Sequence, residues 1–392
     1  MTIKRFSNLI EAANDKSRVR GYTHRFYTYP AGFSPTFVES AIKTFTKKKE
    51  LVFDPFMGGG TSLIEAVRLN RKVVGIDLNP IATFVAKVKL TKLSKAQIDQ
   101  IEREAYFISK ILHYKLKNDQ FSKEALSLIN YKGLGRKEIF NLKTIIKGTS
   151  LYLKKVKEIK DKKVKNFLKL LILRCLHSTL HDKRPIADFH VFKQKIRSNS
   201  LDMLEGMSSL DKYLVNSRNK FSIYSKSSSK THKTKELKSK KVKLIITSPP
   251  YPGINISYAR WHIHGRRNTT LPYLVLGFPI PENKSIFNFQ SPRNRTYDLY
   301  FNKLENIFKS VRKICSKDTV VLQLVAFNHE NGLFEKYLKT LEDCGFKEMK
   351  LKKKGRVWRK VPNRSWQARF VKGNIPASNE VLLMHKIKWE KI

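Results

Sequence analysis

The sequence contains few cysteines, and this limits the classes of protein it can belong to. Only Cys175, Cys315 and Cys344 occur among 392 residues, and they lie far apart. Three scattered cysteines provide neither a disulfide framework nor a CxxC metal pair. We therefore expect a protein of a reducing compartment, where disulfides are rare.

Long apolar segments are also absent. No uncharged apolar run reaches the roughly 18 residues that a membrane-spanning helix needs, and the first twenty or so residues contain no apolar signal core. Hydrophobic residues nevertheless make up 41% of the chain, which is enough for a packed core. The composition therefore predicts a soluble, folded protein without a membrane anchor.

Acidic residues are scarce relative to basic ones. The chain has 32 Asp and Glu against 79 Lys and Arg, a formal net charge of +47. Such an imbalance causes strong self-repulsion in a protein that acts alone. A polyanionic partner, with nucleic acid as the first candidate, explains it best. A lysine-rich coding bias is the alternative.

The order of local patterns predicts an α/β protein interrupted by a long insertion. A strand, glycine loop, helix and strand follow one another within 51–93, and strand and helix patterns return from residue 244. Between them, helical periodicity dominates up to residue 180, and 181–225 fits no single pattern. The run 226–243 contains eight lysines and is expected to be a solvated linker. We predict a core half at 1–93, an insertion at 94–243 and a second core half at 244–392.

A glycine loop follows the first strand of this core. Gly58, Gly59 and Gly60 allow a sharp turn and close approach of a ligand to the backbone, and a helix starts at Thr61. Asp77 ends the next strand, 23 residues after Asp54, close to the spacing of a ribose-binding acid in nucleotide-binding βαβ units. No Gly-Lys-Ser/Thr follows, so ATP is not the expected ligand. A purely structural turn is the alternative.

A second unusual segment, Ser248-Pro249-Pro250-Tyr251, follows the apolar strand at 244–246. Neither proline has a backbone N–H, so the segment ends the strand and presents acceptors rather than donors. A plain turn after a buried strand is the alternative.

Three motifs together carry a family resemblance. "DPFMGGGT" at 54–61 resembles the DPFxGxGT cofactor motif of amino-group (N4-cytosine and N6-adenine) site-specific DNA methyltransferases. "TSPPY" at 247–251 resembles their catalytic motif, and "HRFYTYPAGFSP" at 24–35 resembles their N-terminal motif. The resemblance implies a doubly wound, Rossmann-like α/β core with a large helical insertion, and S-adenosyl-L-methionine (AdoMet) as cofactor.

The resemblance also implies a catalytic role for the proline corner. The lone pair of a base amine is delocalised into the ring, so hydrogen-bond acceptors are needed to free it. The Ser248 hydroxyl and the Pro249 carbonyl are the expected acceptors, Pro250 fixes the corner, and Tyr251 is expected to stack on a flipped base. Serine in the first position is typical of N4-cytosine enzymes, whereas aspartate is typical of N6-adenine enzymes.

The cofactor is expected to contact residues of the N-terminal and glycine motifs and the end of the strand at Asp77. Asp77 would bind the ribose, and Phe56 would pack on the cofactor. Two assignments stay open: Asp54 either contacts the methionine amino group or ends its strand structurally, and Asn79 either touches the adenine or caps the turn at Pro80. Asp202 is a weaker candidate for an acid near the adenine. The full expected cofactor set is Tyr29, Pro30, Asp54, Phe56, Gly58, Gly60, Thr61, Asp77 and Asn79; core packing is the alternative for Tyr29.

Arginines and aromatic residues near the corner are candidates for nucleic-acid contacts. The expected residues are Arg260, Trp261, Arg266 and Arg267, with Arg356 and Arg364 in a later basic segment. A basic structural loop is the alternative. The histidines at 177, 181, 262 and 264 lack acid or cysteine partners at ligand spacing, so no metal site is expected.

The sequence therefore predicts an AdoMet-dependent enzyme that flips a cytosine in double-stranded DNA and methylates its N4 within a specific sequence. The insertion is expected to recognise the target. Family members usually work in the prokaryotic or phage cytoplasm, at the nucleoid, beside a cognate restriction endonuclease. N6-adenine methylation, methylation of a base amine in RNA, and a non-catalytic DNA-binding subunit with a degenerate core are the alternatives.

Overall fold

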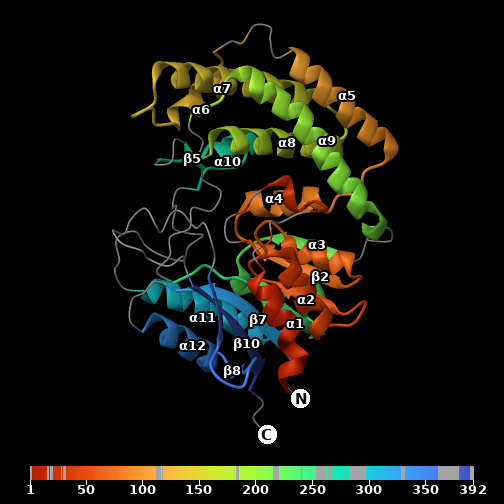
Figure 1. The fold of residues 1–392 in the computed structure, drawn as a ribbon, viewed down its shortest axis with the longest axis vertical. Coiled ribbons are helices and arrows are strands. Elements are labelled where there is room, and N and C mark those ends of the chain that lie inside the picture. The colour runs from red at the N-terminus through yellow and green to blue at the C-terminus, as the bar shows by residue number, and fades with distance from the viewer. Residues whose placement is uncertain are drawn as a thin grey trace.

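The computed structural model has a lower lobe built on an eight-stranded sheet and an upper lobe of helices (Figure 1). It describes residues 2–15, 17, 21–27, 29, 32–111, 116, 118–181, 185–214, 220–239, 241–252, 261–263, 267–281, 297–327, 332–360 and 379–388.

The sheet has the strand order β3-β2-β1-β4-β7-β10-β8, and β9 pairs with β10 beside β8. Five neighbouring strands, from β3 to β7, are parallel, while β10 is antiparallel to its three neighbours. The carboxyl ends of β2, β1 and β4 therefore meet at one edge, where ligands bind in doubly wound folds. The strands are β1 (Leu51–Asp54), β2 (Lys72–Asp77), β3 (Phe221–Ser225), β4 (Val242–Thr247), β7 (Cys315–Ala326), β8 (Phe346–Met349), β9 (Val357–Lys360) and β10 (Asn379–Ile387).

Helices cover both faces of the sheet, which explains why its central strands are continuous apolar runs. Val52 packs with α1, α2 and α3 on one face, while the adjacent Phe53 packs with α11 and α12 on the other. This arrangement confirms the predicted doubly wound α/β core. The covering helices are α1 (Thr2–Asn14), α2 (Pro35–Phe45), α3 (Thr61–Arg68), α11 (Asp298–Arg312) and α12 (Leu333–Asp343).

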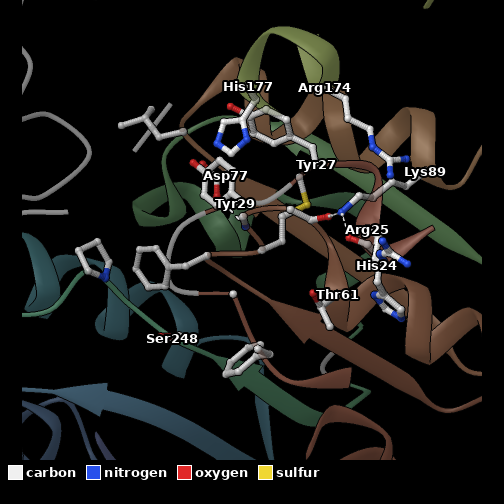
Figure 2. A pocket seen from close by; sticks show the side chains of 18 of the residues that line it. His24, Arg25, Tyr27, Tyr29, Thr61, Asp77, Lys89, Arg174, His177 and Ser248 are labelled. Atoms are coloured by element: carbon white, nitrogen blue, oxygen red, sulfur yellow. Dashed lines mark hydrogen bonds between the residues drawn. The ribbon is translucent and has the colours of Figure 1, made fainter. Parts of the chain in front are cut away.

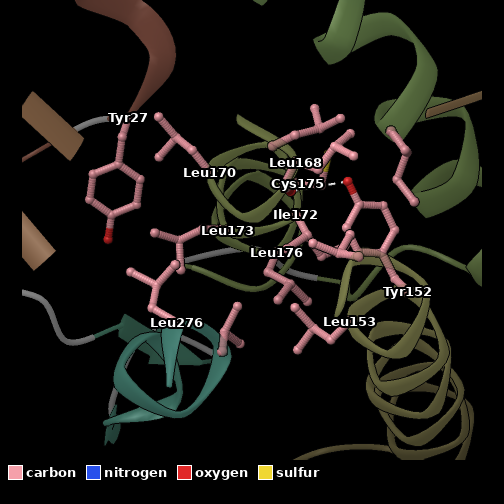
Figure 3. Close-up of a cluster of buried hydrophobic side chains, with 14 of the residues drawn as sticks. Tyr27, Tyr152, Leu153, Leu168, Leu170, Ile172, Leu173, Cys175, Leu176 and Leu276 are labelled. Carbon is pink, nitrogen blue, oxygen red and sulfur yellow. Dashed lines mark hydrogen bonds between the residues drawn. The ribbon is translucent and has the colours of Figure 1, made fainter. Parts of the chain in front are cut away.

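The upper lobe has a core of its own, built around α8. Leu173 and Leu176 of this helix are fully buried, in one cluster with Leu276 of α10 and Tyr27 of the N-terminal segment (Figure 3). Residues from beyond the proline corner thus complete a lobe that was expected to end at residue 243. The lobe consists of α5 (Lys95–Ile111), α6 (Gln120–Ser127), α7 (Arg136–Glu158), α8 (Lys162–Leu180), α9 (Phe189–Leu214), β5 (Trp261–Ile263), β6 (Arg267–Thr269) and α10 (Leu271–Leu276), and it packs on α4 (Pro80–Lys89) of the core.

The lysine-rich run at 226–243 is not a solvated linker, and this corrects the prediction. After β3, which pairs with β2 in the core sheet, the chain forms two 3-10 helices, η3 (Ser228–Lys233) and η4 (Lys235–Leu237). Thr231 and Leu237 are fully buried. The core therefore resumes at about residue 221 rather than 244, because small polar side chains pack inward while the lysines stay at the surface.

Among the described residues, no helix is both long and apolar enough to cross a membrane. All three cysteines are buried free thiols.

Candidate active site

A cavity of about 560 Å³ lies where the carboxyl ends of the central parallel strands face the helical lobe (Figure 2). Its wall includes the glycine loop, the proline corner and the inner side of α8. The lining residues are His24, Arg25, Tyr27, Tyr29, Gly32, Phe33, Phe56, Met57, Gly58, Gly59, Thr61, Asp77, Leu78, Lys89, Arg174, His177, Ser178, Asn199, Ser227, Ser228, Ser248, Pro250 and Ile307.

The glycine loop is fixed to the acid at the end of β2. The Gly58 N–H donates to Asp77 Oδ2 at 2.9 Å, and the Asn79 N–H donates to Asp77 Oδ1 at 2.8 Å. Gly58 has φ +49°, and a Cβ at this position would meet the Tyr29 ring at 3.0 Å. Burial raises the pKa of Asp77 to about 6, so at neutral pH its carboxylate is available as an acceptor on the cavity wall.

Asp54 lies beneath this loop and is not on the cavity wall. It is 1% exposed and accepts hydrogen bonds from the Ser62 hydroxyl, from Phe56 N at 3.0 Å and from Thr247 Oγ1 at 3.1 Å. Burial raises its pKa to about 7. Of the two roles that the sequence left open for Asp54, the structure therefore favours the structural one over a contact with the methionine amino group.

Two other predicted cofactor residues have structural roles away from the wall. Asn79 is 1% exposed and caps α4, with its Oδ1 accepting from Ile81 N at 2.9 Å. Gly60 has φ +80° at the start of α3, and a Cβ there would lie 2.9 Å from that of Ala86. Of the remaining predicted set, Tyr29, Phe56, Gly58, Thr61 and Asp77 line the cavity, and Pro30 lies outside the described residues.

The proline corner presents two of its four residues to the cavity, Ser248 and Pro250. Tyr251 points the other way: it is 1% exposed and packs in the core between the sheet and α11. Its ring is not available for stacking on a base, which corrects that prediction. The sequence identifies the aromatic residue but not the direction in which it points.

The Tyr251 hydroxyl instead connects Ser248 to a buried ion pair. Ser248 Oγ donates to Tyr251 OH at 2.9 Å, and Tyr251 OH donates to Glu380 Oε1 at 2.9 Å. Glu380 is fully buried in β10, and its Oε2 accepts from both Nε and Nη2 of Arg359 of β9, at 2.8 and 2.5 Å. On the other side of the corner, Tyr300 OH donates to the Pro250 carbonyl at 2.7 Å. Two buried tyrosines thus fix the corner.

The structure also corrects one predicted nucleic-acid contact. Trp261 is 1% exposed, and its Nε1 donates to Tyr27 OH at 3.0 Å inside the helical lobe. Arg356 forms a bidentate ion pair with Glu348 at 2.8 and 2.9 Å. Arg260, Arg266 and Arg364 lie outside the described residues, as does the side chain of Arg267.

Several wall residues were not predicted from the sequence. Ser227 and Ser228 follow β3, and Ser228 Oγ donates to the Pro55 carbonyl at 2.5 Å. Their position at a strand end beside the acid-bearing strand was a usable signal, but the lysines around them favoured a linker. Lys89 and Arg174 carried no local signal, because only tertiary packing brings α4 and α8 to the same cavity.

Among the described residues, no group of three or more His, Cys, Asp or Glu side chains is placed to hold a metal ion. The rings of His177 and His181 lie 4.6 Å apart, and that of His262 lies 5.8 Å from His181. Asp202, the weaker adenine candidate, is not on the wall and pairs with Arg174 at 2.6 Å.

Comparison with known proteins supports a family assignment. Residues 7–87 match the family model described as DNA methylase. The Type II methyltransferase M.MjaII of Methanocaldococcus jannaschii is 29% identical over 164 residues, which is 39% of this chain and 31% of that protein. The Type II methyltransferase M.MvaI of Kocuria varians is 33% identical over 129 residues, or 28% of each chain. The matches thus span about a third of the length of these relatives.

Solved structures align only loosely with this chain. The rRNA methyltransferase aviRa from Streptomyces viridochromogenes covers 92% of this chain and 89% of its own, with 9% identity and a TM-score of 0.32. That similarity is too low to carry an argument about substrate. The family model and the sequence relatives agree with the cavity geometry: this chain is similar to DNA methylases, and its match to the family model spans residues 7–87.

Proposed function

We propose that this protein transfers a methyl group from AdoMet to an exocyclic amine of a DNA base, with cytosine N4 as the favoured target. One observation carries the proposal: Ser248 and Pro250 line the same cavity as Gly58, Thr61 and Asp77. A candidate acceptor for a base amine and a candidate cofactor site therefore share one cavity.

The cavity suits AdoMet, which supplies an electrophilic methyl group when bound. Its volume falls within the range of about 300–1,000 Å³ typical of ligand sites. Asp77 and Phe56 line the same wall; the Asp77 carboxylate would accept hydrogen bonds from ribose hydroxyls, and Phe56 would provide an apolar surface for the cofactor. The start of α3 at Thr61 adds free backbone N–H groups.

The hydrogen-bond chain behind Ser248 determines the chemistry that this residue presents. A carboxylate paired with arginine only accepts hydrogen bonds, so Glu380 fixes the Tyr251 proton toward itself. The oxygen of Tyr251 then accepts the proton of Ser248. Ser248 is left with lone pairs for the cavity, as activation of a base amine requires.

Fixed acceptors of this kind contribute to rate by positioning and by electrostatic preorganisation. An amine that donates to Ser248 Oγ would be held with its nitrogen lone pair directed into the cavity, where bound AdoMet would supply the methyl group and leave as S-adenosylhomocysteine. The target base must leave the duplex to reach the cavity, and the net charge of +47 favours binding to the phosphate backbone.

The preference for cytosine N4 rests on serine at position 248, which is typical of N4-specific members of the family. We further propose that the helical lobe contributes to recognition of the target sequence and that the protein works in a restriction–modification or defence setting. The relatives named above are Type II methyltransferases, which supports this setting.

Transfer of label from methyl-tritiated AdoMet tests the substrate class. We expect incorporation into mixed-sequence duplex DNA and none into structured RNA of matched length, with transfer falling steeply between about 50 and 200 mM salt. Incorporation into RNA alone would contradict the proposal. A non-catalytic subunit would bind DNA and transfer no label.

A further inference from the structure

One end of the cavity has two cationic side chains that the proposed chemistry does not use. Lys89 ends α4 beneath the glycine loop, and Arg174 extends from α8 of the helical lobe. Figure 2 shows their side chains close together, on the side of the cavity away from Asp77 and Ser248.

These two charges are poorly compensated. Lys89 is 2% exposed, and within the part of the chain that the structure describes its Nζ donates to two neutral backbone carbonyls, of Gly59 at 3.1 Å and of His24 at 3.3 Å. Arg174 donates to Asp202 through Nη2, whereas its buried Nη1 has no hydrogen-bond partner among the described residues. Burial, and then the charge of Arg174, lower the pKa of Lys89 to about 7. A buried lysine beside a half-buried arginine, with Asp202 paired to the arginine alone, favours binding of a further anion.

The glycine loop connects this end of the cavity to Asp77, the proposed ribose-binding residue. Gly58 donates its N–H to Asp77, and the next residue, Gly59, accepts from Lys89 through its carbonyl. Asp77 and Lys89 therefore contact consecutive residues of the same loop. In AdoMet, the ribose and the methionine carboxylate lie at opposite ends of the non-adenine part of the molecule.

We propose that Lys89 and Arg174 form an anion subsite that binds the carboxylate of the cofactor, an inference that rests on the proposed function. The helical lobe thereby takes part in cofactor binding in addition to any contact with DNA. A backbone phosphate is the other possible anion, but Lys89 lies almost completely buried behind the glycine loop, where a strand of nucleic acid has no access.

The test compares two ligands that differ at the amino-acid end. S-adenosylhomocysteine has the carboxylate, whereas methylthioadenosine has the same nucleoside without the amino-acid part. Isothermal titration should show that Arg174→Met weakens S-adenosylhomocysteine binding about 10- to 100-fold, as expected for a lost charge-assisted hydrogen bond. Affinity for methylthioadenosine should change less than about twofold, because this ligand does not reach the subsite.

Arg197→Met is the matched control, since Arg197 is an exposed arginine of α9 that is not on the cavity wall. This variant should bind both ligands like the wild type. Lys89→Met, checked for folding by thermal unfolding, should repeat the selective loss seen with Arg174→Met.

The other outcomes separate the two proposals. Equal loss of both ligands in Arg174→Met would show a structural role and overturn the subsite, as would unchanged S-adenosylhomocysteine affinity. If Arg174→Met lost affinity for DNA but not for S-adenosylhomocysteine, the subsite would bind a DNA phosphate, and the proposal that it binds the cofactor carboxylate would be wrong. A wild-type protein that binds neither ligand would contradict the proposed function itself.

Discussion

Replacing Ser248 with alanine should lower kcat for methyl transfer by about 10²–10³-fold, the usual cost of removing one preorganised polar group at a reacting centre. The substitution removes the acceptor that faces the cavity and leaves Tyr251 bonded to Glu380. Affinity for S-adenosylhomocysteine should change less than about twofold, because Asp77 and the glycine loop are untouched. Single-turnover transfer and isothermal titration measure the two effects separately.

Asp77→Asn is the matched comparison for this experiment. It alters the acceptor beside Gly58 rather than the proline corner, so it should weaken S-adenosylhomocysteine binding while single-turnover transfer at saturating cofactor changes far less than in Ser248→Ala. If Ser248→Ala keeps full turnover, its hydroxyl is not the acceptor and the proposed mechanism is wrong.

Replacing Glu380 with glutamine should lower the free energy of unfolding by about 3–5 kcal/mol, the usual cost of removing one partner of a buried ion pair. Arg359 has a 13% exposed side chain and would lose its carboxylate partner. Chemical denaturation measures the change.

The same substitution should lower kcat by about tenfold, the effect of losing one correctly directed hydrogen bond. An amide can donate as well as accept, so glutamine allows the hydrogen bonds through Tyr251 to reverse and to point the Ser248 proton into the cavity.

Tyr337→Phe is the control. The Tyr337 hydroxyl donates to Gln323 Oε1 at 2.5 Å in the same hydrophobic core but is not one of the hydrogen bonds that connect Ser248 to Glu380. It should cost about 1 kcal/mol of stability and leave kcat unchanged. Equal kcat losses in both variants would show a general effect of core disruption.

The parts of the core that depend on local patterns were predictable from the sequence. The apolar run ending at Asp54, the three glycines and the acid at Asp77 define strand, turn and strand through short-range rules. Ser94 begins α5 by an equally local rule: its Oγ accepts from Gln97 N at 3.3 Å while Gln97 Oε1 accepts from Ser94 N at 2.9 Å. The strand at 379–387 was likewise evident from its apolar residues.

The direction in which individual side chains point in the folded protein was not predictable in the same way. Trp261 and Tyr251 lie next to functional segments, yet both are buried because their polar atoms find partners far away in sequence, at Tyr27 and Glu380. The lysines of 226–243 led to the prediction of a solvated linker, whereas serine and threonine side chains of this segment pack inward. Charge composition describes the surface of such a segment and leaves its backbone path open.

The most direct test of the central claim is to identify the methylated product. The protein is incubated with AdoMet and mixed-sequence duplex DNA, the DNA is digested to nucleosides, and methylated nucleosides are separated by mass spectrometry. The proposed function predicts N4-methylcytosine, formed about 10²–10³-fold more slowly by Ser248→Ala. N6-methyladenine would agree with the proposed site and contradict the cytosine assignment. If the protein binds AdoMet but the digested DNA contains no methylated nucleoside, methylation of DNA is contradicted.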